Sequence, residues 1–503
     1  MSNKASNQLF LLIKSLSKQE KRYFKIFSNR HSSDNNNYYK LYQIISQQEE
    51  YDEEKVIEKL KDQQFVNRLS IAKTRLYDQL LKSLNAYHSS KTVDSELFFI
   101  LQSIEVLYHK ALYKAAWKKL QRGLKLAKKY EKYELTLQLY KWEHKLLEKE
   151  NYESLDSDNL DLMWNAESTV VDQIKIYNKL WYIKSKIFKI LFYSGSRTRK
   201  NIAMVNLFLK KNIDSIDQSE LSVRSKFLLH HIYSAYNYSV NELEKSYDHL
   251  KLNLQLMERF PWMFVDNPYT QISLVSNMAF IGFKLRKNED INSLLIKLKE
   301  LKKAAEASDV NLHIRWFYSY YSIYLAVKSA HQSIKIDQFE INQIYKGLDK
   351  FEDNLPTFRR LDLQFALSVY YFKAGETRTA LRGVHSILNE LNSKLNPEMF
   401  FAARFFYLVL LLEMEKIDYL NVAWTSTKRS LSANKSLSPE GFVLKEFFDQ
   451  VCKNGQPDLY TLLEKLIANL DNLKLNRYIE YFDFKKWAID KKESFQTTDA
   501  MAS

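Results

Sequence analysis

Ten cationic side chains and no acidic one lie between Gln173 and Ile213. A surface with cations but no counter-charges keeps a positive potential, which attracts anionic partners in a salt-sensitive way. The stretch therefore predicts a binding site for an anionic partner. Its candidate contact residues are Lys184, Lys186, Lys189, Arg197, Arg199 and Lys200.

The segment YSGSRTRKN, residues 193–201, lies inside this stretch and is expected to be a turn. We expect one helix to end near Tyr193, with Gly195 as its cap, and the next to start at about Thr198. A structural explanation also exists for Arg197, because a cation is favourable beside the negative end of a helix dipole.

Histidines and carboxylates give weaker signals. His230 and His231 are adjacent, so on a helix they point about 100° apart and do not share a metal ion easily. His249 can approach one of them across a helical hairpin, but packed or surface histidines are the favoured interpretation. The acidic residues of 153–161 lack the regular ligand positions and turn glycine of a calcium loop, which favours a solvated linker.

Enzyme motifs are absent from the sequence. It has no glycine-rich nucleotide loop and no nucleophile elbow, and the chain contains eight glycines in all. Aromatics such as Trp181, Tyr182, Phe188 and Phe192 are interpreted as core, because their positions coincide with helix faces that must be buried. We therefore expect a non-enzymatic protein with no catalytic residue, metal site or cofactor.

Composition indicates a reducing compartment. The single cysteine, Cys452, excludes an intramolecular disulfide. The apolar run near the N-terminus is too short for a signal peptide, and the stretch from Met399 to Met414 is shorter than a bilayer span and contains Arg404. These features predict a cytoplasmic protein without a membrane span, with residues 399–414 forming a buried helix.

The net charge of +15 has two interpretations. It can reflect a polyanionic partner. It can equally reflect an AT-rich coding sequence, because Lys, Asn, Ile, Tyr and Phe are abundant together. Clustered charge is therefore more informative than total charge.

The first ninety residues predict a module of short helices. Ser17 and Glu20 have the spacing of a capping box, and Asp52 is a candidate N-cap. Residues 38–88 hold three predicted helices in the order that a helix-turn-helix domain uses. The third would offer Arg68, Lys73 and Arg75 to nucleic acid.

From about residue 95, helical hairpins recur in which the second helix carries small or apolar residues at spacings of three, four and three. Such a stripe lets the partner helix approach closely, and neighbouring hairpins must then stack to bury their remaining faces. The stripes are Tyr113, Ala116, Leu120, Gly123; Leu243, Ser246, Leu250, Asn253; Ile291, Leu294, Leu298, Leu301; Thr377, Ala380, Val384, Ile387; and Leu420, Ala423, Thr427, Ser430.

Residues 361–394 resemble one tetratricopeptide repeat, with Leu367 and Tyr371 at the pattern's first-helix positions and Ala380 at its second-helix alanine. The segment departs from the pattern at Gln364, Ser368, Val384 and Asn392. The resemblance implies a helical scaffold for protein–protein contacts.

Together these patterns predict an all-α protein: a right-handed α-solenoid of antiparallel, tetratricopeptide-like helix pairs with an N-terminal helical module. The expected parts are a module in 1–90, a repeat array in 91–437, capping helices in 438–492 and a flexible tail in 493–503.

Two functions follow as hypotheses. The leading one is an interaction scaffold that binds a peptide or helix of another protein in a helical groove. The alternative is a nucleic-acid-associated regulator in which the N-terminal segment contacts DNA while the array acts as a sensor or self-associates.

Overall fold

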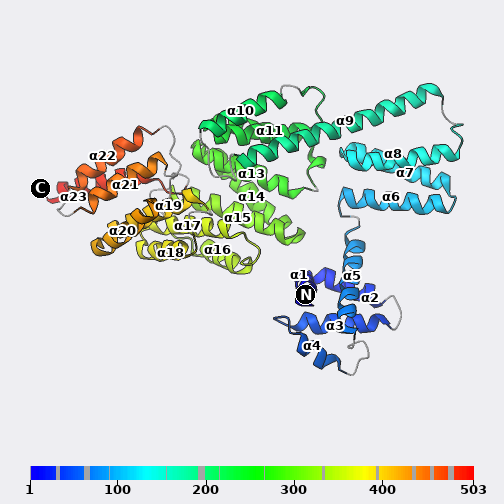
Figure 1. Cartoon of the computed structure of the whole chain (residues 1–503), viewed down its shortest axis with the longest axis horizontal. Coiled ribbons are helices and arrows are strands. Elements are labelled where there is room, and N and C mark those ends of the chain that lie inside the picture. Colours follow the sequence, from blue (N-terminus) through cyan, green and yellow to red (C-terminus); the bar gives the residue numbers. More distant parts are fainter. Residues whose placement is uncertain are drawn as a thin grey trace. The chain divides into compact units, whose positions relative to one another are not determined.

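The computed structural model is built from helices (Figure 1). It is 84% helical and has no strand among the residues it describes, which confirms the all-α prediction. The described residues are 2–29, 34–61, 68–89, 91–153, 156–190, 199–213, 216–265, 267–330, 335–391, 396–432, 438–453, 458–473 and 481–502. The chain divides into two compact units, residues 1–174 and 175–503.

The first unit begins with five helices that share one core. Helices α1, α2 and α3 pack against the longer α5, and α4 packs against α3. The core contains Leu9, Phe24, Ile45 and Leu76. The bounds are α1 (Ser2–Ser15), α2 (Lys18–Asn29), α3 (Asp34–Gln47), α4 (Glu53–Leu60) and α5 (Leu69–His88).

Both predicted N-terminal caps are confirmed. The backbone N–H of Glu20 donates to the Ser17 hydroxyl, and the Ser17 N–H donates to the Glu20 carboxylate at 2.7 Å. The carboxylate of Asp52 accepts from the backbone N–H of Lys55 at the start of α4. Short-range capping rules therefore fix where these two helices begin.

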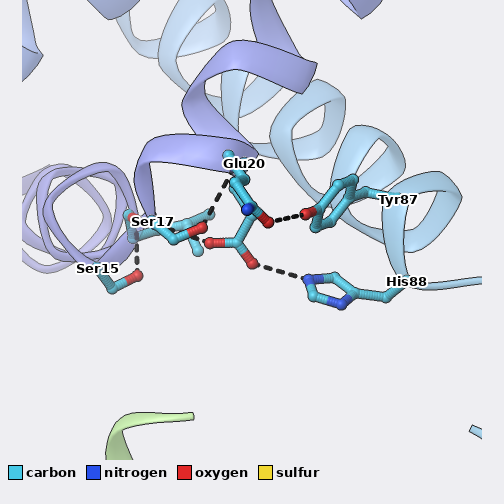
Figure 2. A network of polar contacts seen from close by, with 7 residues as sticks. Ser15, Ser17, Glu20, Tyr87 and His88 are labelled. Atoms are coloured by element: carbon cyan, nitrogen blue, oxygen red, sulfur yellow. Dashed lines mark hydrogen bonds and ion pairs between the residues drawn. The ribbon is translucent and has the colours of Figure 1, made fainter. Parts of the chain in front are cut away.

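Glu20 also ties α2 to the end of α5. Figure 2 shows its carboxylate between Ser17 and the ring of His88, whose Nε2 lies 2.8 Å from Glu20 Oε1. Beside it, the Tyr87 hydroxyl donates to Gln19. One carboxylate therefore serves as a local cap and as a contact between helices far apart in sequence.

The rest of the first unit is a separate set of antiparallel helices around Leu97, Ile104, Leu120 and Leu139. Helix α7 packs against both α6 and α8. Their bounds are α6 (Val93–His109), α7 (Tyr113–Lys129) and α8 (Tyr133–Lys149), followed by α9 (Ser157–Phe188), within which the division between the two units falls.

The second unit continues the same arrangement of neighbouring pairs. Its helices are α10 (Arg199–Ile213), α11 (Val223–Ser239), α12 (Leu243–Arg259), α13 (Pro268–Lys284), α14 (Asn288–Ser308), α15 (Val310–Ser329), α16 (Gln338–Lys350), α17 (Thr357–Lys373), α18 (Thr377–Glu390), α19 (Pro397–Glu413), α20 (Ile417–Ser432), α21 (Pro439–Val451), α22 (Leu459–Asp471) and α23 (Phe484–Ala502). Helices α13, α15 and α17 alternate along the chain with α14 and α16. Helix α15 also packs against both α13 and α17.

The predicted stripes lie on α7, α12, α14, α18 and α20, and most of their residues are buried. A Cβ on Gly123 would lie 3.0 Å from both Ile100 and Leu139. The hydroxyls of Ser246 and Ser234 are 3.0 Å apart across the α11/α12 pair. Small residues therefore permit close helix approach, as the spacing predicted.

A three-residue turn of constant geometry joins the helices of these pairs. In α6/α7 its middle residue, Ala111, has a φ of 57°, and the N–H of Leu112 donates to the carbonyl of Leu107 at 2.9 Å. This is the Schellman pattern that closes helix ends. The corresponding turns are 240–242, 285–287, 374–376 and 414–416, and among these five Gly375 is the one glycine at the left-handed position.

The C-terminal helices share a core with α17–α20. Phe405 and Phe406 of α19 contact Phe448, Phe482 and Phe484. Residues 399–412 are mostly buried, which confirms the prediction of a buried helix there. No helix in the described ranges combines the length and apolar character that a membrane crossing needs.

Helix α23 continues to Ala502, through most of the segment that the sequence predicts to be a flexible tail from residue 493. Phe495 packs against the C-terminal core, and no Gly or Pro interrupts the helix after it. The sequence pattern alone did not reveal this tertiary contact.

We expect Gly347→Ala to destabilise the protein by about 1–3 kcal/mol, because a Cβ there would collide with the Phe317 ring. Denaturation by urea, followed by circular dichroism, measures the change. Gly282→Ala is the matched control: its Cβ would make ordinary contacts at 3.5 Å to Tyr247, so stability should stay equal or rise by up to about 1 kcal/mol. Equal stability of the two variants would contradict this packing.

We expect Glu20→Gln to lower stability at neutral pH and to have less effect as the pH falls below 4.5, the ordinary pKa of this carboxyl. Burial alone would raise the pKa of Glu20, but the hydrogen bonds from Ser17 and His88 outweigh it and lower the pKa. The carboxylate's contribution is therefore present above the ordinary pKa and lost as the pH falls through the lowered one.

Urea denaturation at neutral and acidic pH tests this expectation, with the exposed Glu58→Gln as control. A pH-independent difference between Glu20→Gln and the parent chain would refute the ionic role of Glu20.

Candidate functional site

The acid-free stretch covers the second half of α9 and all of α10. The turn predicted around Gly195, including Arg197, lies outside the described residues, and so does the side chain of Arg199. Lys184, Lys186, Lys189 and Lys200 are described. The structure therefore places four of the six candidate cations.

Helices α9 and α10 are held by an apolar core. Leu180, Ile183 and Ile187 of α9 share a cluster with Val205 and Leu209 of α10, and all five are buried. Residues of α11, including Leu228 and Ile232, complete the cluster. The helices consequently turn other side chains outward.

On the outward side of α9, Tyr182 is 55% exposed, and its ring lies edge-on to Phe208 of α10 with the centroids 5.8 Å apart. The ammonium of Lys186 lies 4.4 Å from the Phe208 ring centroid and 3.4 Å from the Tyr182 hydroxyl oxygen. Cation–π attraction thus positions Lys186 between two rings while its charge remains at the surface.

Exposed apolar side chains continue along α10. Met204 is 47% exposed and Leu207 is 72% exposed. Lys189 and Lys200 are exposed as well. We call this surface the α9–α10 face; it comprises Tyr182, Lys186, Lys189, Lys200, Met204, Leu207 and Phe208.

Lys184 does not share this environment with Lys186. Its ammonium lies 4.4 Å from the ring centroid of Trp181 and 5.7 Å from that of Phe188. Burial, and then the nearby charge of Arg315, lower the pKa of Lys184. Because residues two apart on a helix point about 200° apart, one sequence cluster supplies two separate surfaces.

Aromatic exposure is the feature that the sequence interpretation missed. Their spacing predicts core positions for Trp181 and Tyr182, but the two side chains are 43% and 55% exposed. The core positions are taken by Leu180 and Ile183, which flank them. An exposed aromatic beside a lysine on the same helix face was the signal available in the sequence.

The three N-terminal candidates have different environments. Arg68 is exposed at the start of α5, and Arg75 is exposed while donating to the Tyr38 hydroxyl. Lys73 is 8% exposed, and its ammonium lies 3.0 Å from the Glu53 carboxylate of α4. Lys73 therefore packs inside the module, because α4 supplies a counter-charge that the helix pattern of α5 did not show.

His230 and His249 meet across the α11/α12 pair, with their Nδ1 atoms 3.2 Å apart. Burial, followed by the charges of His249 and Lys226, lowers the pKa of His230 to about 4. Both rings are then neutral near pH 7, and one Nδ1–H donates to the other Nδ1. No group of three or more metal-ligating side chains occurs in the described part of the chain.

No protein-family model matches this chain, and no curated protein or solved structure matches it significantly.

Proposed function

We propose that this chain is a non-enzymatic protein–protein interaction scaffold whose α9–α10 face binds an acidic amphipathic segment of another protein. The observation that carries the proposal is the combination on this face of exposed apolar side chains with exposed lysines. Within the described ranges, no carboxylate forms an ion pair with Lys186, Lys189 or Lys200. The proposed partner supplies both the missing negative charge and an apolar side.

The apolar residues would contribute most of the binding free energy. Covering a side chain as exposed as Leu207 contributes about 1.5–3 kcal/mol, and Met204 and Tyr182 lie on the same face. The surrounding lysines would mainly select an acidic partner and accelerate its association. An amphipathic helix with an acidic flank suits such a surface.

The helical pairs support a scaffold role in a second way. The segment that resembles a tetratricopeptide repeat is described as far as residue 391, and it lies in the α17/α18 hairpin. We propose that the pairs of the second unit form a right-handed, tetratricopeptide-like solenoid. Stacked pairs of that kind present long surfaces to peptides without needing catalytic groups.

The nucleic-acid alternative depends on the N-terminal module. Arg68 and Arg75 remain exposed there, but Lys73 is engaged by Glu53. Two exposed arginines can neutralise only a few phosphates of a nucleic-acid duplex. Nucleic-acid binding is therefore the second candidate and an explicit outcome of the test below.

We expect the variant with Lys186, Lys189 and Lys200 all changed to Glu to bind a fluorescein-labelled acidic amphipathic helix at least about tenfold more weakly, because three attractions become repulsions. Fluorescence anisotropy at low and moderate salt measures the affinity. The control replaces the exposed lysines Lys251, Lys346 and Lys465 with Glu, which gives the same net charge elsewhere in the second unit.

Substitution of both Met204 and Leu207 by serine should weaken binding of the same labelled helix at every salt concentration, because the apolar contribution does not depend on salt. Equal binding by the parent chain, the face variants and the control would contradict the proposal. Tight, salt-dependent binding of mixed-sequence duplex DNA, abolished by Arg68→Glu with Arg75→Glu, would favour the nucleic-acid alternative instead.

A further inference from the structure

A second group of cations lies away from the α9–α10 face and draws on three helices. It comprises Lys184 of α9, Arg315 of α15 and Arg359 of α17, in which the charge of Arg315 acts on Lys184 and the charge of Arg359 acts on Arg315. Each of these side chains is partly exposed, so a ligand in solvent can reach it. We call this group the inner cation cluster.

Aromatic rings and one hydroxyl hold the three cations in place. Lys184 lies over the rings of Trp181 and Phe188, and Phe188 stacks on His231 with the centroids 5.7 Å apart. The guanidinium of Arg359 lies 5.1 Å from the Tyr318 ring centroid. Rings orient these charges without neutralising them.

Arg315 is the central member. Its Nη2 donates to the Ser273 hydroxyl of α13 at 2.6 Å, while its Nε is buried and has no hydrogen-bond partner among the described residues. A guanidinium nitrogen that is buried without a partner is costly, and a ligand oxygen would remove that cost.

Two carboxylates lie near the cluster and accept hydrogen bonds from tyrosine hydroxyls, so they keep their negative charge. Asp309 accepts from the Tyr269 hydroxyl at 2.8 Å and also caps α15 through the N–H of Leu312. Asp362 accepts from the Tyr318 hydroxyl at 2.7 Å. No ion pair to Lys184, Arg315 or Arg359 is formed by any described residue.

The cations consequently act on one another. Burial lowers the pKa of Arg315, and the charge of Arg359 lowers it further. Burial lowers the pKa of His231 to about 4, with Lys184 and Arg315 adding to the effect. Asp309 and Asp362 offset part of this repulsion, but the buried Nε of Arg315 still has no acceptor among the described residues.

We propose that Lys184, Arg315 and Arg359 form a binding site for a phosphoryl dianion. Guanidinium groups match the paired oxygens of phosphate, and a lysine adds a point charge. A phosphoryl group is compact, doubly charged and rich in acceptor oxygens, so it can accept hydrogen bonds from more than one of these cations. The dianion is either free in solution or carried on a phosphorylated side chain.

The test uses the full chain and isothermal titration calorimetry near neutral pH at constant ionic strength. The probes are inorganic phosphate, a short phosphoserine peptide and the same peptide without phosphate. We expect the first two to bind, and Arg315→Gln or Arg359→Gln to weaken both by about tenfold or more. The exposed Arg382→Gln is the control for loss of one charge.

The ratio of the two affinities identifies the source of the phosphoryl group. Tighter binding of the phosphopeptide indicates a modified protein, and tighter binding of inorganic phosphate indicates a free anion. Thermal unfolding gives a second readout: phosphate should raise the melting temperature of the parent chain and of Arg382→Gln, but not that of Arg315→Gln.

Without phosphate, Arg315→Gln removes a repulsion and also loses the hydrogen bond to Ser273, so its melting temperature is compared with that of the parent chain before phosphate is added. If Arg315→Gln does not fold, Arg359→Gln decides alone, since its guanidinium has no hydrogen bond to lose within the described part of the chain. Absence of phosphate binding, or binding unchanged in these variants, would overturn the proposal. The α9–α10 face is intact in every variant, so this failure is distinct from failure of the scaffold proposal.

Discussion

Close approach of paired helices is the constraint on which this architecture depends. Where one helix presents Gly123, Ser246 or Ala380 to its partner, the backbones come near enough for large side chains on either side to interdigitate. A hairpin packed in this way still has apolar surface on its other faces, so each pair requires neighbours. Extended rows of pairs, and the long surfaces along them, follow from that requirement.

Both candidate binding surfaces consist of side chains that this packing leaves outside the core. The α9 helix must direct Leu180, Ile183 and Ile187 into its core, which sends Lys186 toward α10 and Lys184 toward the side where His231 lies. In each place aromatic rings, and not carboxylates, surround the lysine. Such surroundings orient a charge without cancelling it, which is what recognition of an anion needs.

Features set by local rules were predictable from the sequence. The capping box at Ser17, the cap at Asp52 and the buried stripes depend on residues within a few positions of one another. Features set by partners distant in sequence were not. The burial of Lys73 required Glu53 of a different helix, and the contact of Phe495 with the core required the folded C-terminal helices.

The candidate site shows the same division. Absence of acids between residues 173 and 213 marked the correct segment for exposed lysines, because it is a property of one stretch. The inner cation cluster joins Lys184 to residues more than a hundred positions away, and no spacing rule relates them. Its members come together only through the packing of helices that are distant in the sequence.

The recurrent three-residue turn has a consequence for how this architecture can diverge. Ala111, Asn241, Arg286 and Glu415 all adopt the left-handed conformation that glycine would adopt with less strain. The three-residue turn is therefore specified by its length and its backbone hydrogen bonds, and the identity of its side chains matters little. Mutation can replace nearly every residue of a hairpin while its angle persists. Chains with this architecture can therefore lose detectable sequence similarity while they keep the same fold.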